Sequence, residues 1–582
     1  MNSQKVLKKT LTIILAIFAA ASISALEVDR NEIQSTGGAD TVVFRNYSGP
    51  HSVINTIAEI RQIGSSLGEQ VNGNLQKSGT FGSSNRYSVI HAVDLNTKEK
   101  LDADILIIGK NATVDHITNL RRIISAYLSA AYGYSNRDAD TIATFVTVYN
   151  AVYRGQIDTY NSKYKDVVTK NLSASIVGLS TDYREWPGKS QIVIPLSDLA
   201  GGLSTVDTSL ISDKQVIKSM QGEDDKGVDS RKGMVDIKER EADNEQEKAD
   251  SAQKKADDEK AKLAEEQKKS AQANKNAASA QKKADEANKN AASAQKKADE
   301  ANKKAQENPD DKKAQSDASK AQKEADSAKK EADSAQKEAD EQNKKTESQS
   351  QTASSAQKSA DEAQAKADQK RSEAQEERTS IAKDQQSLIK ESSQNADGNV
   401  IYGLKVLDDA GVTSELVKMD SQTGTVLKES PVTVIRGRTA FDAGDSFIAI
   451  AGTNFGNGAV RLVAIDKKNL EIAIESAEKL SEVSVLVEKE GSYFCTIQEG
   501  SDYYIGKYND KVENQLKSQV KVKASTPITI TAKGILVTDS NGQAIVLNPQ
   551  DLSSISPASA QDNRNALQRA ADSASNVYSN AK

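Results

Sequence analysis

The sequence predicts a multidomain protein with an α+β N-terminal domain, a long α-helical coiled-coil hairpin or rod, and an all-β, propeller-like C-terminal domain. Two observations carry this prediction: the composition changes abruptly twice along the 582 residues, and the middle stretch repeats a 14-residue unit, "SAQKKADEANKNAA". The predicted parts are a signal peptide at 1–25, the α+β domain at 27–210, a linker at 211–231, a charged helical coil at 232–395 with a break at 307–311, a β domain at 397–555 and a polar tail at 556–582.

The first residues have the pattern of a secretory signal peptide. Lysines precede the apolar run "LTIILAIFAAASISA", and small residues then lead into the charged "EVDR", so we expect cleavage after Ser24 or Ala25. The apolar run is shorter than the roughly 20 residues that a membrane-spanning helix needs. We therefore expect a mature chain without an integral membrane span, exported across the inner membrane. A periplasmic or envelope-associated location and exposure at the cell surface both stay open.

The first globular region reads as α+β. "NRYSVIHAVDL", "ADILIIG" and "SQIVIPL" have the composition of buried strands. "VDHITNLRRIISAYLSAAYGY" and "DADTIATFVTVYNAVYRG" have apolar residues at helical spacing, which predicts two adjacent amphipathic helices.

The repeat region predicts a long helix with a weak seam. Ala, Lys, Glu and Gln are good helix formers, and the alanines alternate in steps of four and three, as in a heptad: Ala280, Ala284, Ala287, Ala291, Ala294, Ala298, Ala301 and Ala305. An alanine methyl stabilises a seam far less than the roughly 1.5–3 kcal/mol of a buried Leu or Val. A paired coil is favoured, and a single or partly frayed helix is the alternative.

"QENPDDKKAQ" marks a break in the coil. Asn308 can cap a helix, Pro309 suits its first position, and Asp310 and Asp311 complement the helix dipole. The two arms, 232–307 and 309–390, are nearly equal in length, so an antiparallel hairpin would bury both seams. Each arm would be roughly 110 Å long. A kinked, extended rod is the alternative, and self-association through the coil is also open.

The third region predicts repeated strand–turn–strand units. "LVKMDSQTGTVLKES" and "LVAIDKKNLEIAIES" share one plan, and the turn residues Asp420, Asp466, Asn509 and Asn548 recur at the spacing of propeller blades. The chain holds only about three to four such units, whereas a closed propeller has at least about four blades. We expect a small or partial propeller, or a curved sandwich.

Catalytic and metal-binding patterns are absent from the sequence. The single Cys495 excludes a disulfide framework, and we expect it to be a buried apolar residue. His51, His91 and His116 lack metal-ligand spacing and are expected at the surface or at helix caps. A net charge of −6 gives no general attraction to nucleic acid. We expect no enzyme, no cofactor and no metal.

Aromatic residues give the one faint signal of a binding site, because most of the 16 tyrosines and the only tryptophan lie in the first region. Tyr and Trp suit binding surfaces because they combine an apolar body with a polar edge. The candidate partner-binding residues, which could line a groove for a peptide or a glycan, are Tyr149, Tyr153, Arg154, Tyr183, Trp186 and Lys189. We favour the simpler interpretation that Tyr149 and Tyr153 belong to the core and its rim.

A resemblance to a known family rests on four stretches of the first region. They are "FRNYSGP" (44–50), "NLRRIISAYL" (119–128), "VTVYNAVYRG" (146–155) and "GLSTDYREWPGKSQIVIPL" (178–196). In order and spacing the chain resembles the spirochaete (Borrelia-type) 83/100-kilodalton antigen family. The resemblance implies a signal peptide, a charged coil, a β-rich C-terminal domain and an immunogenic, envelope-associated protein. It implies no catalytic mechanism and no defined ligand. The Ala/Lys-rich coil departs from the family's coil, which is richer in Leu and Ile.

These features favour a non-enzymatic, extracytoplasmic envelope protein that acts as a structural spacer or scaffold for protein partners. Envelope proteins or peptidoglycan are the expected partners. The alternative is a surface-exposed adhesin whose helical stalk displays a binding domain. An enzyme that acts on glycan or peptide is disfavoured, because no acid/base or nucleophile constellation is recognisable.

Overall fold

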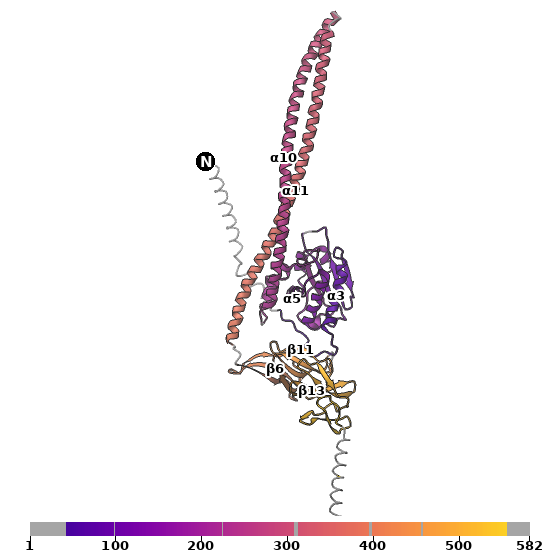
Figure 1. Ribbon diagram of the computed structural model, residues 1–582, viewed down its shortest axis with the longest axis vertical. Helices are drawn as coiled ribbons and strands as arrows, with labels where there is room; N and C mark the ends of the chain where they lie inside the picture. The colour runs from indigo at the N-terminus through magenta and orange to yellow at the C-terminus, as the bar shows by residue number, and fades with distance from the viewer. Residues whose placement is uncertain are drawn as a thin grey trace, which may run out of the picture. The chain divides into compact units, whose positions relative to one another are not determined.

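The computed structural model describes residues 42–97, 99–223, 225–307, 312–394, 399–455 and 458–555, together with Gln568. The predicted signal peptide, nearly all of the predicted break and nearly all of the predicted tail lie outside these residues. The chain forms two compact units (Figure 1). We call them the globular unit (the described residues up to Gly201, Lys214–Val228, and the described residues from Lys383 to 555) and the coil unit (the described residues of Gly202–Asp213 and Asp229–Ala382). None of the helices in the described residues is long and apolar enough to cross a membrane.

The N-terminal part of the globular unit has the predicted α+β fold. One antiparallel sheet has the order β1 (Gly79–Gly82), β2 (Tyr87–Ala92), β3 (Asp102–Ile108) and β4 (Ser190–Leu196), so neighbours in the sheet follow in chain order. Every residue of β4 is buried, as expected for the near-continuous apolar run "SQIVIPL". The long helices are α3 (Ile57–Asn72), α4 (Ile117–Tyr132) and α5 (Asn136–Val152). The short ones are α6 (Ile157–Lys163), α7 (Asp166–Thr169), the 3₁₀ helix η1 (Tyr183–Glu185) and α9 (Lys214–Met220).

Helices α3 and α4 cross at unusually close range. A Cβ atom on Gly64 would lie 2.0 Å from the backbone oxygen of Ile123, and one on Gly68 would lie 2.6 Å from the backbone oxygen of Tyr127. Only glycine therefore permits this approach of the two backbones. The register of α3 is fixed at its start, where Thr56 and Glu59 form a capping box.

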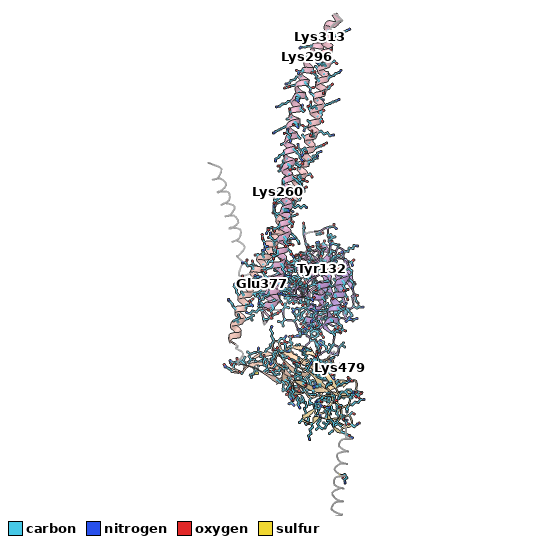
Figure 2. The ribbon with its side chains drawn as sticks, in the orientation of Figure 1. Tyr132, Lys260, Lys296, Lys313, Glu377 and Lys479 are labelled. Carbon is cyan, nitrogen blue, oxygen red and sulfur yellow. The ribbon has the colours of Figure 1, made fainter. Side chains whose placement is uncertain are left out.

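A buried polar network joins α4 to the sheet. His91 and Asp104 are 0% exposed, and the His91 Nδ1 atom lies 2.6 Å from an Asp104 oxygen. Tyr127 and Tyr132, the latter labelled in Figure 2, both donate to the other oxygen of Asp104. Burial lowers the pKa of His91, but the bond to Asp104 and the charge of that carboxylate outweigh it and raise the pKa. The prediction that His91 lies at the surface or at a cap is wrong, because Asp104 satisfies it in the core.

The coil unit is an antiparallel helical hairpin. Helices α10 (Val228–Glu307) and α11 (Lys312–Gln394) run side by side (Figure 1) and are joined by cross-helix bonds such as Gln364 Nε2 to Gln246 Oε1, 3.1 Å, and Gln357 Nε2 to Gln253 Oε1, 3.1 Å. Lys260 lies part-way along the hairpin, and Lys296 and Lys313 lie near its turn (Figure 2). The hairpin prediction is confirmed over the extended rod, and α10 ends at Glu307, where the break was predicted.

The alanines of the predicted seam are buried or half-buried where their side chains are described. Ala280, Ala284 and Ala291 of the predicted seam are buried, while Ala287 and Ala294 are half-buried. Small clusters pair them with α11, for example Ala280 and Ala284 with Ala332, and Ala277, one turn earlier, packs against Ala339. The side chains of the last predicted seam residues, Ala298, Ala301 and Ala305, lie outside the described set.

The base of the hairpin contains ion pairs in addition to buried apolar side chains such as Ile237, Ala242 and Ala374. Arg231 bonds Glu377 (2.5 Å), Lys238 bonds Glu373 (2.6 Å), and Lys370 lies 2.8 Å from Glu241. The short helix α8 (Thr208–Ile211) joins this layer, because Thr208 donates to Glu241 at 2.6 Å. Such pairs stabilise little when compared with an apolar isostere, but they specify one register between the helices.

The β region consists of consecutive antiparallel sheets. Strands β5–β11 form one seven-stranded sheet, in the order β11-β10-β9-β8-β6-β5 with β7 paired to β6; β12–β15 and β16–β18 form a four-stranded and a three-stranded sheet. The strands of the first sheet are β5 (Val400–Val406), β6 (Thr413–Asp420), β7 (Val426–Glu429), β8 (Ile435–Asp442), β9 (Ser446–Ala451), β10 (Arg461–Asp466) and β11 (Ile472–Glu475). Those of the second are β12 (Val487–Lys489), β13 (Ser492–Glu499), β14 (Asp502–Tyr508) and β15 (Asn514–Lys517). Those of the third are β16 (Thr529–Thr531), β17 (Gly534–Thr538) and β18 (Ala544–Leu547).

Apolar clusters lie between successive sheets of this region. One joins Ile448 and Leu462 of the first sheet to Cys495 of the second, which confirms that Cys495 is a buried apolar residue. The described residues form no closed propeller. The strand–turn–strand units at Asp420, Asp466 and Asn509 are confirmed, but the fourth unit turns at Asp539, not at Asn548. The Asp539 side chain bonds the N–H groups of its own turn, whereas Asn548 follows the last strand.

Candidate functional site

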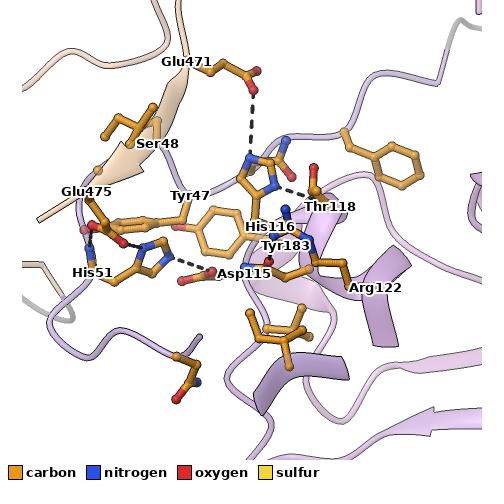
Figure 3. Close-up of a pocket in the computed structure, with 18 of the residues that line it drawn as sticks. Tyr47, Ser48, His51, Asp115, His116, Thr118, Arg122, Tyr183, Glu471 and Glu475 are labelled. Atoms are coloured by element: carbon orange, nitrogen blue, oxygen red, sulfur yellow. Dashed lines mark hydrogen bonds and ion pairs between the residues drawn. The ribbon is translucent and has the colours of Figure 1, made fainter. Parts of the chain in front are cut away.

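A cavity of about 1040 Å³ opens within the globular unit, between its α+β region and its β region (Figure 3). Residues 43–57, the start of α4 and the strand β11 with its preceding turn supply most of its lining. Figure 3 shows Glu471 and Glu475 on the β11 side and His116, Thr118 and Arg122 on the α4 side. Clefts between domains are the usual place for ligand sites, because walls from two folds converge there.

The segment 42–56 connects the two walls of the cavity. Its backbone bonds the α+β region, from Arg45 N to Thr181 O (2.7 Å) and from Tyr47 N to Asp115 O (2.9 Å). It also bonds the β region, where the Arg461 Nε atom donates to the backbone oxygen of His51 (2.7 Å). Regions that are far apart in sequence are thus held together by one extended stretch.

His51 is the central residue of this connection. Its Nδ1 atom lies 2.8 Å from Glu475 and its Nε2 atom lies 3.0 Å from Asp115. Since carboxylates only accept, both ring nitrogens must donate, and the ring is an imidazolium. Burial lowers the pKa of His51, but the hydrogen bonds and charges of Asp115 and Glu475 outweigh it and raise the pKa to about 10. His51 therefore acts as a charged clamp across the cavity floor.

His116 is in the opposite protonation state. It is the N-cap of α4, where its Nδ1 atom accepts from the N–H of Thr118 (3.2 Å). Burial lowers the pKa of His116 to about 4, and the positive charges of His51 and Arg122 add to this effect against the opposing charge of Asp115. The neutral ring must carry its proton on Nε2, which faces Glu471 at 3.9 Å. This is too long for a direct hydrogen bond.

The remaining walls combine isoleucines with tyrosine rings. Tyr47 contacts both His51 and Tyr183 edge-to-face, with ring centres 5.1 and 6.2 Å apart. The aliphatic lining residues include Ile54, Ile57, Ile60, Ile63, Ile472 and Ile474. The charged lining residues balance, with Arg45, Arg122, Arg184 and protonated His51 against Asp115, Asp466, Glu471 and Glu475.

The comparison with protein families fits this architecture. The family model described as the Borrelia P83/100 protein matches residues 30–528. The chain belongs to the Borrelia P83/100 family. The match contains every residue that lines the cavity, the whole hairpin and most of the β region. The family predicted from the four N-terminal stretches is therefore confirmed, and membership makes the chain an envelope antigen-type protein. A search of curated proteins found none that matches.

The candidate residues predicted from sequence do not form one groove in this P83/100 chain. Tyr149 and Trp186 are 0% exposed, and the Trp186 Nε1 atom donates to the backbone oxygen of Ser180 (2.7 Å). Tyr153 is also buried, so the tyrosine pair belongs to the core and its rim, as favoured from the sequence. Arg154 is half-buried beside Glu185, Lys189 is exposed, and Tyr183 is the one candidate that lines the cavity.

Sequence reasoning missed the residues that converge at the cavity. His116 was predicted at the surface or at a cap and is an N-cap, but Asp115, Glu471 and Glu475 gave no signal of their own. The preceding stretch "ATVDH" before a helical pattern was the one cue available, because it places His116 at a helix start. Among the described residues, no group of His, Cys, Asp and Glu could hold a metal ion.

Proposed function

We propose that this P83/100-family chain is a non-enzymatic, extracytoplasmic envelope scaffold that binds protein partners and whose hairpin acts as a spacer. The observation that carries the proposal is the pair of helices, 80 and 83 residues long, whose contacts are largely small and polar. At 1.5 Å per residue each helix is about 120 Å long. Such a hairpin supplies length.

The composition of the hairpin supports a spacer more than a partner-binding coil. Its seam alanines permit close packing but offer little apolar area to a third helix. Exposed faces carry ion pairs one turn apart, such as Lys262 with Glu259 and Lys269 with Glu266. Pairs of this kind hold an exposed helix straight and soluble. Partner binding is therefore assigned to the globular unit.

Protease accessibility in cells tests the location on which the proposal depends. Trypsin is added to intact cells and then to cells whose outer membrane has been opened, and fragments are detected with an antibody against the β region. The lysine-rich hairpin is the expected cleavage site. We expect cleavage only after opening, as for a periplasmic spacer. Cleavage in intact cells would favour the adhesin with a helical stalk.

Cross-linking then tests the scaffold role itself. A photo-reactive residue at Lys479, an exposed position of the β region labelled in Figure 2, and a second at Lys296 near the hairpin turn would report two different neighbourhoods. We expect reproducible adducts with envelope proteins at Lys479. Adducts at neither position would contradict the scaffold proposal.

A further inference from the structure

We infer that the cavity of the globular unit binds a neutral, hydroxyl-rich glycan segment, with one ligand hydroxyl bridging His116 and Glu471. The inference goes beyond the scaffold role, because it assigns a site and a class of ligand. It rests on the proposed function only for the compartment in which the glycan would be met.

The distance between the two side chains carries the first step. The His116 Nε2 atom and a carboxylate oxygen of Glu471 are 3.9 Å apart, so they do not bond each other. One ligand oxygen atom at about 2.8 Å from each side chain would form a hydrogen bond with both of them. A hydroxyl is the group that fits, because it accepts one hydrogen bond and donates another.

The protonation states of both residues support a ligand hydroxyl that accepts from His116 and donates to Glu471. The bond from Thr118 N–H to His116 Nδ1 fixes the tautomer, so Nε2–H is a donor aimed into the cavity. The low pKa of His116, about 4, keeps the ring neutral at physiological pH. Burial raises the pKa of Glu471, and its carboxylate accepts from the ligand hydroxyl. A neutral N–H donor opposite a carboxylate acceptor matches a hydroxyl, which accepts from the first and donates to the second.

The other walls favour a neutral ligand and suit a sugar ring. Asp115 and Glu475 are already occupied by His51, and Arg45 and Arg184 both pair with Asp182. These four charged side chains already have partners within the protein, which favours a neutral ligand over an ion. Tyr183 and the isoleucines offer flat apolar surface to the apolar face of a pyranose. A cavity of about 1040 Å³ is large enough for a short oligosaccharide.

An extended peptide is the competing occupant, because β11 is an edge strand of its sheet and lines the same cavity. The glycan is favoured because strand addition would use backbone groups of β11 and would leave the gap between His116 and Glu471 without a role. The two occupants differ in whether binding depends on those two side chains.

The test titrates the mature full-length protein with neutral oligosaccharides: chitotetraose, cellotetraose and maltotetraose. Saturation-transfer NMR and calorimetry measure binding. The variants are His116→Asn, which keeps a capping acceptor but removes the Nε2–H donor, and Glu471→Gln, which keeps the size of the side chain. The matched control is Glu499→Gln, an exposed carboxylate that is not part of the cavity lining. Melting temperatures show that each variant is folded.

We expect saturable binding of at least one of the three glycans, weakened about tenfold in either variant and unchanged in the control. The double variant should bind about as weakly as the weaker single variant, because both side chains hold the same hydroxyl. Absence of binding by all three glycans would overturn the inference, as would unchanged affinity in both variants. Binding of an isoleucine-containing extended peptide in their place would assign the cavity to a peptide. None of these results bears on the protease test of location.

Discussion

At the scale of single residues, the charge of His51 makes the stability of the globular unit depend on pH. Its pKa is about 10 in the folded chain and about 6.5 when unfolded. Stabilisation by its charge is therefore complete below pH 6.5 and is lost as the pH rises through 10. We expect His51→Gln to lower the free energy of unfolding by at most roughly 5 kcal/mol at pH 6, at about 1.4 kcal/mol for each unit between the two pKa values, and by progressively less towards pH 10. Urea titrations of both proteins across this range measure the difference.

The matched control for that measurement is His116→Asn. The pKa of His116 is lowered to about 4, so its ring is neutral both folded and unfolded above pH 7.5. The cost of replacing it should not change between pH 7.5 and pH 10. If the loss of unfolding free energy caused by His51→Gln were also constant between pH 7.5 and pH 10, the clamp could not depend on a charged His51 ring.

The three histidines show why the sequence predicted so little of the cavity. His51 and His91 follow unremarkable local patterns, and their roles depend on partners elsewhere in the sequence. Glu475 contacts His51 across 424 positions, and Asp104 contacts His91 across 13. Only His116 has a local role, as the N-cap of α4, and this role could be predicted from the sequence. The family stretches, by contrast, are contiguous strings and could be recognised from the sequence.

At the scale of elements, the contact between α3 and α4 depends on glycine. We expect Gly64→Ala to destabilise the globular unit by about 2 kcal/mol, because overpacking against the backbone of α4 exceeds the roughly 1 kcal/mol gained in helix propensity. The control is Gly73→Ala at the end of the same helix, where a Cβ atom meets nothing closer than 3.9 Å and φ is −70°. It should be neutral or slightly stabilising. Thermal melts distinguish the two, and equal melting temperatures would contradict the close crossing.

The alanine seam can be tested with two adjacent alanines of the hairpin. Ala277 is 5% exposed and packs against α11, whereas Ala278 is exposed. We expect Ala277→Leu to separate the helices locally and to lower the melting temperature of the hairpin, since no cavity exists for the larger side chain. Ala278→Leu should leave it unchanged. Circular dichroism and spin-label distances across the hairpin provide the measurement, and similar effects of both changes would rule out a tight seam.

The sequence predicted elements well wherever a periodic pattern was long. The heptad steps of alanine predicted the helices and their seam, and Pro309 placed the end of the first helix close to Glu307. The turn at Asp539 was missed because "DSNG" gives the same local signal as Asn548, and only strand pairing separates them. Closure of a propeller depends on contacts between the first and last sheets, and such contacts leave no trace in the spacing of turns.

At the scale of the whole molecule, the part that supplies length, the hairpin, is distinct from the globular unit. The globular unit contains its own apolar cores and the His51 clamp. Where the chain leaves this unit and returns to it, Gln221 bonds Asp384 (2.9 Å) and Lys226 bonds Ser387 (3.0 Å). We therefore expect that replacing residues 254–356 with a four-residue turn, just beyond the bonded pair Gln253 and Gln357, leaves the melting temperature of the globular unit within about 2 °C. Calorimetry measures this.

The same truncation separates the spacer from the glycan site. Because the ion pairs of the base and the cavity both remain, oligosaccharide affinity should be unchanged while about 75 Å of reach is lost. Cells that carry the truncated chain should then show altered cross-links to envelope proteins if distance is what the hairpin provides. Cross-links identical to those of the full chain would assign the function to the globular unit alone. A truncated chain that fails to fold would instead show that the hairpin is part of the structural core.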